Sequence, residues 1–309
     1  MEPQDIGASV SFLRSVPPVS GFHYGLLAAG PSLDARAPSV DDLVTRVAGY
    51  AMRYGSQLGA VVAEEEYTQW IERVPGTATV PGLGATRRVI RSDFVLIASG
   101  DAESWVGLRD AFEVDGVPVR DREQRLLAAL TGGADDAWRR AVRIANESAR
   151  FNIGSTLITR NINVPTFVLQ LLHGPNRERF RASLRKGPSG GSGTSAPPLA
   201  GGNGTARVDV EYRERDRPTL VRQRNGSDQP LRATVSVDPA TGEVWQTHLT
   251  WERGPGGAID VDFGRAPDID VLVPLRMFEA YRSAPAVIYG EGIYSNFRRF
   301  VTSVRVVTP

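Results

Sequence analysis

Strict alternation of apolar and polar residues dominates the last third of the chain and constrains its fold more than any other feature. Val208, Val210 and Tyr212 alternate with charged residues. The same period of two returns in four more runs, 233–238, 245–251, 259–263 and 273–281. Such alternation is typical of antiparallel strands that bury one face and expose the other to water. The pattern therefore predicts a meander of strands that share one apolar face.

An amphipathic helix and further strands precede this meander. Apolar residues recur at helical spacing over about 40–60, after a capping-box-like Ser39 and Asp42. Helices stand before and within the strand series rather than between each pair of strands, which disfavours a parallel sheet. β-Branched and aromatic residues indicate strands in three earlier stretches, 66–71, 86–99 and 104–114. We expect an α+β fold in which about ten or eleven strands form a strongly curved antiparallel sheet, an unclosed β-barrel, with helices packed on its concave side.

Composition divides the chain into one large domain and a short leading segment. Residues 1–38 are rich in proline and carry no convincing secretory signal, so we expect a disordered or degenerate targeting segment. Residues 39–309 are expected to form a single curved-sheet domain with a helical insertion at 121–173 and a flexible glycine-rich loop at 187–204. Three helices are expected in the insertion, over 121–130, 135–151 and 165–173.

The residue inventory excludes several chemistries. The chain has no cysteine, so disulfides, thiolate zinc sites, iron–sulfur clusters and thiol nucleophiles are ruled out. Thirty-six basic and 35 acidic side chains leave a net charge of +1, which gives no global attraction for nucleic acid or anionic lipid. No apolar run approaches the roughly 20 residues of a membrane-spanning helix. No nucleotide-binding loop or metal-ligand pattern is found, and we expect neither cofactor nor metal.

A polar constellation on the longest helix of the insertion is the one candidate locus for enzymatic chemistry. Asn146, Glu147 and Arg150, followed by Arg160, form the densest group of polar residues beside apolar sequence. They could bind a ligand head group, or they could cap one another and anchor the helices at the sheet edge, and we favour the second interpretation.

Two other sets of titratable residues have simpler interpretations. Glu64 and Glu66 would share one face of a strand and could supply an acid–base pair, but a solvated junction between helix and strand is the favoured interpretation. The three histidines, His23, His173 and His248, are expected to be structural or on the surface. No catalytic residue is therefore assigned.

Large aromatic and apolar side chains offer a different kind of site. They lie on strand faces that would turn inward in a curved sheet, where a concavity only partly filled by helices would bind an apolar ligand. Ordinary core packing accounts for the same residues. The candidate ligand-binding residues are Trp105, Phe112, Trp245, Trp251, Met277 and Tyr281.

The order and texture of these elements resemble a known group. Three segments carry the resemblance, and they are Val-Val-Ala-Glu-Glu-Glu-Tyr-Thr-Gln (61–69), Val-Pro-Leu-Arg-Met (273–277) and Gly-Glu-Gly-Ile-Tyr-Ser-Asn-Phe-Arg-Arg-Phe (290–300). With the meander between them, they look like uncharacterised bacterial exported proteins similar to the LolA/LolB-like lipoprotein-sorting fold. The resemblance spans about 40 to 307. It implies an unclosed barrel with helices as a lid, and carriage of a lipid or acylated protein in the periplasm or outside the cell. The chain departs from this group in its poor export signal, its insertion and glycine-rich loop, and its lack of a lipoprotein cysteine.

These observations favour a non-catalytic cell-envelope protein that binds a lipid or acyl chain in the concavity of its sheet. One alternative is a scaffold or protein-interaction module with a filled core. A less favoured alternative is a hydrolase-type enzyme that uses the polar helix residues. The expected partner is a lipid or an acylated protein and not a nucleic acid, and the oligomeric state stays open. An apolar cavity between helices and sheet would discriminate between the first two.

Overall fold

The computed structural model describes eleven stretches of the chain, which are 38–58, 61–74, 76, 86–98, 105–119, 134–154, 162–185, 207–222, 226–251, 256–283 and 285–299. The chain divides into a unit Met1–Ala37 and a compact unit Pro38–Pro309, and all described residues belong to the second. The expectations for residues 1–37, for a helix at 121–130 and for a loop at 187–204 lie outside the described residues, as does Arg160.

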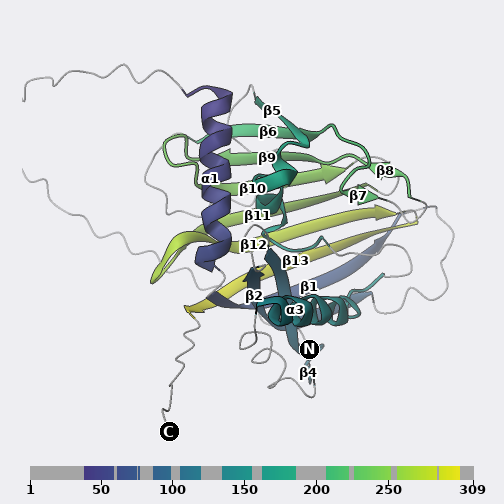
Figure 1. The fold of residues 1–309 in the computed structure, drawn as a ribbon. Helices are drawn as coiled ribbons and strands as arrows, with labels where there is room; N and C mark the ends of the chain where they lie inside the picture. Colours follow the sequence, from purple (N-terminus) through teal and green to yellow (C-terminus); the bar gives the residue numbers. More distant parts are fainter. Residues whose placement is uncertain are drawn as a thin grey trace, which may run out of the picture. The chain divides into compact units, whose positions relative to one another are not determined.

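Eleven strands form one antiparallel sheet in the described part of the chain (Figure 1). Their order is β4-β3-β2-β1-β13-β12-β11-β10-β9-β6-β5, so β4 and β5 are the two edges and the sheet does not close. The strands are β1 Val61–Arg73, β2 Arg87–Ala98, β3 Trp105–Val114, β4 Val117–Pro118, β5 Phe180–Leu184, β6 Val208–Glu214, β9 Arg232–Val237, β10 Val244–Trp251, β11 Gly256–Ala266, β12 Ile269–Ser283 and β13 Ala286–Arg299. A separate two-stranded ribbon consists of β7 Val221–Arg222 and β8 Asp228–Gln229. The predicted α+β fold with an unclosed antiparallel sheet is confirmed.

The pairing of β1 with β13 joins the two halves of the sheet. Four strands from the first half of the chain stand on one side of this pairing and the remaining strands on the other. The register runs antiparallel from Val61 opposite Arg299 to Arg73 opposite Ala286. We call this β1–β13 pairing the seam. Because the seam joins distant parts of the chain, its register depends on side-chain contacts rather than on a local turn.

One tyrosine of the first helix, α1 (Val40–Leu58), shows how strongly the sheet curves. The ring of Tyr54 lies 6.4 Å from the ring of Trp105 on β3 and 6.3 Å from the ring of Phe263 on β11. Five strand spacings separate β3 from β11 in the sheet, and they cover about 24 Å along its surface. Two residues so far apart along the sheet can contact one side chain only because the sheet wraps around α1.

Helix α1 crosses the concave face like a strap, and glycines allow close approach at two points (Figure 1). A Cβ at Gly55 would collide with the indole of Trp105. Gly242, in the turn between β9 and β10, has φ of +77°, and a Cβ there would lie 2.5 Å from the backbone carbon of Arg46. Arg46 also donates a hydrogen bond to the carbonyl of Pro239 in that turn. The helix therefore packs against β3 and the β9–β10 turn.

The start of α1 confirms the predicted capping box. Asp42 accepts a hydrogen bond from the backbone N–H of Ser39 at 3.1 Å, and its own N–H donates to the Ser39 hydroxyl at 3.2 Å. Together with the Ser39 hydroxyl, which also donates to the carboxylate, these bonds lower the pKa of Asp42. Two of the backbone donors that begin the helix are thereby satisfied.

The other helices lie on both faces of the sheet. Short helices α4 (Phe167–Leu171) and α5 (Gly174–Arg177) follow each other, and α4 packs with α1 into the main core on the concave side. Helix α3 (Ala134–Ala149) packs instead on the outer face of β2 and β3. Its residues Ala141 and Ile144 form a smaller core there with Val62, Val95, Ile97 and Leu108. The expected concave position thus holds for α1 and α4, whereas α3 covers the opposite face.

Candidate functional site

Four of the six candidate ligand-binding residues lie on the concave face. Trp105, Trp251, Met277 and Tyr281 belong to the main core, and none is more than 3 % exposed. The Trp105 indole stacks on His173 with 4.9 Å between ring centroids. Trp251 and Tyr281 contact each other at 5.7 Å. The concavity of the sheet thus brings these residues into one apolar interior, where they pack against one another.

A bulge in β3 moves Phe112 out of the regular alternation. The register with β2 passes from Ala111 to Glu113, so Phe112 is an extra residue with no partner position in β2. Its side chain is half-buried. A bulge of this kind cannot be predicted from a period-two pattern, because the pattern assumes that every residue pairs in register with the neighbouring strand.

Trp245 is displaced by a similar irregularity in β10. The register with β9 passes from Val244 to Gln246, and the fully buried Val244 takes the inward position. The half-buried ring of Trp245 lies 4.3 Å from the guanidinium carbon of Arg207 and 5.9 Å from that of Arg265. Trp245 therefore makes cation–π contacts at the margin of the core instead of filling the concavity.

The polar helix residues do not join the aromatic set. Asn146, Glu147 and Arg150 lie on or just after α3, which covers the outer face of the sheet, and Asn146 and Arg150 are exposed. The Arg150 guanidinium lies 4.9 Å from the ring of Phe151. Arg160 lies outside the described residues. The described members of this constellation are thus on the opposite side of the sheet from the apolar interior.

A buried polar network at the seam is the main feature that the sequence analysis missed. Its centre is Glu65 on β1, whose side chain is fully buried. Arg109 on β3 donates to both carboxylate oxygens, Tyr294 on β13 donates at 2.7 Å and Ser92 on β2 donates at 2.9 Å. Ser92 and Tyr294 are the residues directly opposite Glu65 in the two neighbouring strands. One carboxylate therefore links four adjacent strands.

A second buried carboxylate extends the network across β13. Glu279 on β12 accepts hydrogen bonds from the hydroxyls of Tyr67 and Tyr281, the latter at 2.8 Å. The Tyr67 hydroxyl reaches Glu279 over Gly290, where a Cβ would lie 2.5 Å from the carboxylate and 2.6 Å from the tyrosine oxygen. Tyr67 also stacks under the Arg109 guanidinium, 4.4 Å from its ring centroid. The absence of a side chain at position 290 is what allows this hydrogen bond to cross the strand.

Electrostatics in the network favour a permanently charged pair. Burial by itself would raise the pKa of Glu65, but the charge and hydrogen bonds of Arg109, with those of Tyr294 and Ser92, outweigh it and lower the pKa. Burial would lower the pKa of Arg109, and Glu65 outweighs this and raises it. Burial and the nearby carboxylate raise the pKa of Tyr294. Every oxygen of Glu65 and Glu279 accepts a hydrogen bond from another described side chain.

Glu64 and Glu66, the neighbours of Glu65 in β1, point to the outer face of the sheet. Glu64 pairs with Arg298 at 3.2 Å and Glu66 pairs with Arg91 at 3.2 Å, all four side chains being 42–54 % exposed. Glu64 and Glu66 are thus solvated, as expected, but they lie within β1 rather than at a junction between helix and strand. The signal for Glu65 was available in the alternation itself, because Ala63, Glu65 and Tyr67 share the inward face of the strand.

Four hydroxyls of the main core are buried without a hydrogen-bond partner among the described residues. They belong to Tyr50 and Tyr54 on α1, Tyr212 on β6 and Thr247 on β10. Burial raises the pKa of all three tyrosines. Buried polar groups are normally hydrogen-bonded, so four unpaired hydroxyls on the inward side call for an explanation.

Neither histidine in the described part of the chain has a catalytic setting. His173 is buried against Trp105. His248 lies on the wet face of β10 and pairs with Asp260, its partner in the register with β11, at 2.5 Å. No group of three or more His, Asp or Glu side chains that could hold a metal ion occurs among the described residues. None of the helices described is long and apolar enough to cross a bilayer.

Comparison with known proteins gives two structural likenesses. No family model and no curated protein matches the sequence. The chain is similar in structure to a candidate outer membrane lipoprotein-sorting protein domain from Vibrio parahaemolyticus, with 11 % identity and a TM-score of 0.40 over 87 % of this chain and 96 % of that one. It is also similar to a DUF1329 family protein from Desulfovibrio piger, with 9 % identity and a TM-score of 0.36 over 86 % and 95 %. The first of these two structures is a lipoprotein-sorting domain, the class that the sequence resemblance names.

Proposed function

We propose that the protein is a non-catalytic binding protein that holds a hydrophobic ligand, a lipid or acyl chain, between α1 and the concave face of its sheet. The observation that carries this proposal is that the buried hydroxyls of Tyr54, Tyr212 and Thr247, on the side of the sheet that also holds the aromatic side chains, have no hydrogen-bond partner among the described residues. A ligand with an ester or carboxyl group would accept hydrogen bonds there, and its chain would contact the aromatic side chains. A location in the cell envelope follows from the sequence resemblance and is part of the proposal.

Ligand entry in this proposal requires α1 to move. Trp105 stacks on His173, and Trp251 packs against Tyr281. Trp105, Trp251 and Tyr281 are almost fully buried. The strap formed by α1 rests on glycine contacts at Gly55 and Gly242. Displacing such a helix opens the concave face without breaking any strand pairing, since all the sheet hydrogen bonds lie in other elements.

A scaffold or protein-interaction module is the second candidate function. The observation that favours it is the packing of the same aromatic residues against one another, which is how an ordinary core is filled. In that case the exposed strand edges β4 and β5 would carry the interaction, because unpaired edges are templates for strand addition.

Brominated fatty acids test the first proposal directly, because bromine quenches only indoles that it contacts. We expect saturable quenching of the wild-type protein and a smaller quenched fraction in Trp105→Phe. The matched control is Trp70→Phe, since Trp70 lies on the outer face and stacks on Tyr289 at 5.2 Å. Native mass spectrometry of the purified protein should show a bound lipid. Absence of both saturable quenching and co-purified lipid would refute the proposal and favour the scaffold.

A further inference from the structure

A surface pocket of about 310 Å³ opens at the ends of three strands, away from α1. It lies where β6 ends, β9 begins and β10 ends, whereas α1 contacts the turn at the other end of β9. The pocket is lined by Arg213, Glu214, Arg217, Pro230, Leu231, Arg232, Thr250 and Trp251. Three arginines and one acidic residue line the pocket, and two of the arginines, Arg213 and Arg217, pair with carboxylates outside the lining, which leaves Arg232 as its uncompensated charge among the described residues.

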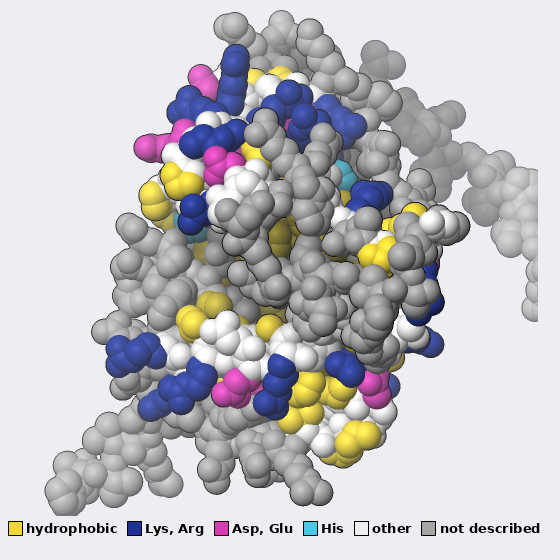
Figure 2. Space-filling view, turned by 90° about the vertical axis from the view of Figure 1, so that its right-hand side faces the viewer, with side chains coloured by type: hydrophobic (Ala, Val, Ile, Leu, Met, Phe, Trp, Pro, Cys, Tyr) yellow, Lys and Arg dark blue, Asp and Glu magenta, His cyan; other side chains and the backbone are white. Residues whose placement is uncertain are grey.

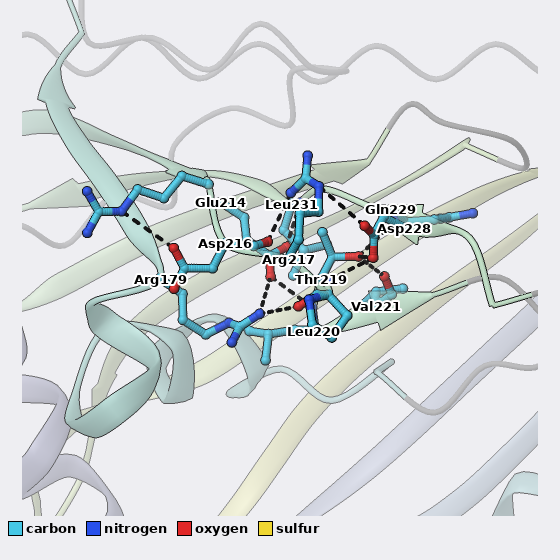
Figure 3. Close-up of polar contacts among 12 residues, drawn as sticks. Arg179, Glu214, Asp216, Arg217, Thr219, Leu220, Val221, Asp228, Gln229 and Leu231 are labelled. Carbon is cyan, nitrogen blue, oxygen red and sulfur yellow. Dashed lines mark hydrogen bonds and ion pairs between the residues drawn. The ribbon is translucent and has the colours of Figure 1, made fainter.

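The single acidic residue of the lining is already occupied. Glu214 accepts hydrogen bonds from the backbone N–H groups of Leu220 at 2.8 Å and Leu231 at 3.1 Å, and it lies 3.6 Å from the Arg179 guanidinium (Figure 3). Its carboxylate therefore holds the connection between β6 and β9 in place. Because its charge is satisfied within the wall, it opposes the binding of an anion only weakly.

Described residues of this connection hydrogen-bond to one another beside the pocket. Asp228 accepts hydrogen bonds from the backbone N–H of Thr219 at 2.9 Å and from its hydroxyl at 3.2 Å, and these bonds lower the pKa of Asp228. Thr219 in turn accepts a hydrogen bond from the backbone N–H of Gln229 at 2.9 Å (Figure 3). These hydrogen bonds position Asp228, which pairs with Arg217 at 3.3 Å and so holds Arg217 beside the pocket.

Two of these arginines lie opposite each other on neighbouring strands. Arg213 and Arg232 are direct partners in the antiparallel register of β6 and β9. Like charges directly opposite in a sheet are destabilising. Glu211 pairs with Arg213 and Asp228 pairs with Arg217 at 3.3 Å, but Arg232 makes no ion pair with any described residue. Basic side chains also gather over the β5–β6–β9 edge in the upper part of Figure 2.

The remaining wall of the pocket is apolar. Leu231 and Trp251 belong to the main core, and Trp251 packs against Tyr281 at 5.7 Å. Pro230 completes this side of the lining. Leu231 and Trp251 are only 1 % and 3 % exposed, so the carbon atoms of a ligand would contact Pro230 and the margins of these two side chains.

We propose that this pocket binds an anionic amphiphile, a phosphate or carboxylate group with a short apolar tail. The anion lies between Arg213 and Arg232, within reach of Arg217, and the tail lies against Pro230 and the margins of Leu231 and Trp251. Bidentate hydrogen bonds from a guanidinium match both kinds of head group. The site opens at the surface and does not require α1 to move, so it does not depend on ligand binding in the concavity.

Calorimetric titration of the full chain tests the proposal with hexyl phosphate, inorganic phosphate and the uncharged hexyl glucoside. Hexyl phosphate should bind at one site, roughly tenfold more tightly than inorganic phosphate because its tail is removed from water. Arg232→Gln should weaken that binding about tenfold, the effect of one charge-assisted hydrogen bond. The matched control is Arg87→Gln on β2, which removes an exposed arginine that makes no ion pair with any described residue.

Two outcomes would overturn the assignment. Equal loss of affinity in Arg232→Gln and Arg87→Gln would show only a general effect of charge. Equal affinity for hexyl phosphate and hexyl glucoside would show that the pocket does not recognise the negative charge. Equal affinity for hexyl phosphate and inorganic phosphate would show that it does not recognise the apolar tail. Quenching through Trp105 and titration through Arg232 report on different residues, so failure of the concave site and failure of this pocket are distinguishable.

Discussion

Replacing Glu65 by glutamine measures what the buried network contributes, because β1 supplies its own control in the next residue. Glu65 is fully buried, whereas Glu66 is 54 % exposed and pairs with the half-exposed Arg91 on the outer face. Both substitutions remove one negative charge from adjacent positions of one strand. Any difference between them therefore reports burial and partners rather than sequence context.

The expected magnitudes differ several-fold. Removing one member of a buried ion pair costs about 3–5 kcal/mol, and Glu65→Gln belongs near the lower end because the amide oxygen still accepts one hydrogen bond. The Arg109 side chain, only 13 % exposed, is then left without a counter-charge. Loss of an exposed pair such as Glu66–Arg91 costs about 0–1 kcal/mol. Against a typical total of about 5–15 kcal/mol, the first change is large and the second is minor.

Urea unfolding followed by circular dichroism measures both changes. A double-mutant cycle with Arg109→Met should give a combined loss that is smaller than the sum of the single losses, because the second change removes a charge that the first left unpaired. A loss in Glu65→Gln within about 1 kcal/mol of that in Glu66→Gln would refute the reasoning, since burial would then have no consequence.

The same pair makes a pH prediction. The pKa of Glu65 is lower in the folded protein than its usual 4.5. A depressed carboxyl pKa contributes stability above the unfolded value, and this contribution is lost as the pH falls below that value toward the folded one. The stability difference between wild type and Glu65→Gln should therefore be constant near neutrality and shrink below about pH 4.5, as measured by urea unfolding over a pH series.

Three further substitutions have defined outcomes. Tyr54→Phe should raise the free energy of unfolding of the ligand-free protein by about 1 kcal/mol, because it removes an unpaired buried hydroxyl, and a loss would mean that the hydroxyl has a partner. Gly290→Ala should lower it by about 1–3 kcal/mol by forcing Tyr67 away from Glu279, and an unchanged urea midpoint would contradict the crossing hydrogen bond. Gly242→Ala should cost about 1–3 kcal/mol through its positive φ and its contact with α1, measured by thermal unfolding, and no change would contradict that contact.

Periodicity was enough to predict the sheet because each strand obeys it almost everywhere. The alternation in β6, β10 and β11 reports directly which face is buried, and the capping box marks the start of α1. The faces of Phe112 and Trp245 could not be predicted, since each lies at a bulge where one extra residue shifts the alternation. The side of the sheet that α3 covers also depends on tertiary packing, which a helical stripe alone does not encode.

The buried network escaped prediction for a different reason. A run of three glutamates looks like a solvated surface, and two of them, Glu64 and Glu66, are indeed on the wet face. The inward position of Glu65 has meaning only with Arg109, Tyr294 and Ser92, which come from three other strands. No local pattern in the sequence shows that these four residues meet.

The network also gives the seam a register that apolar packing alone would define poorly. Glu65 and Tyr294 are 229 residues apart in the sequence, so no turn sets their pairing. A slip of β1 by one residue would turn Glu65 to solvent and bring Glu64 and Glu66 onto the concave face, away from Arg298 and Arg91. It would cost every hydrogen bond to Glu65 and leave Arg109 without its counter-charge, whereas a slip between purely apolar faces would cost mainly packing. The buried charge is therefore tolerated in the core because only one pairing of β1 and β13 satisfies it.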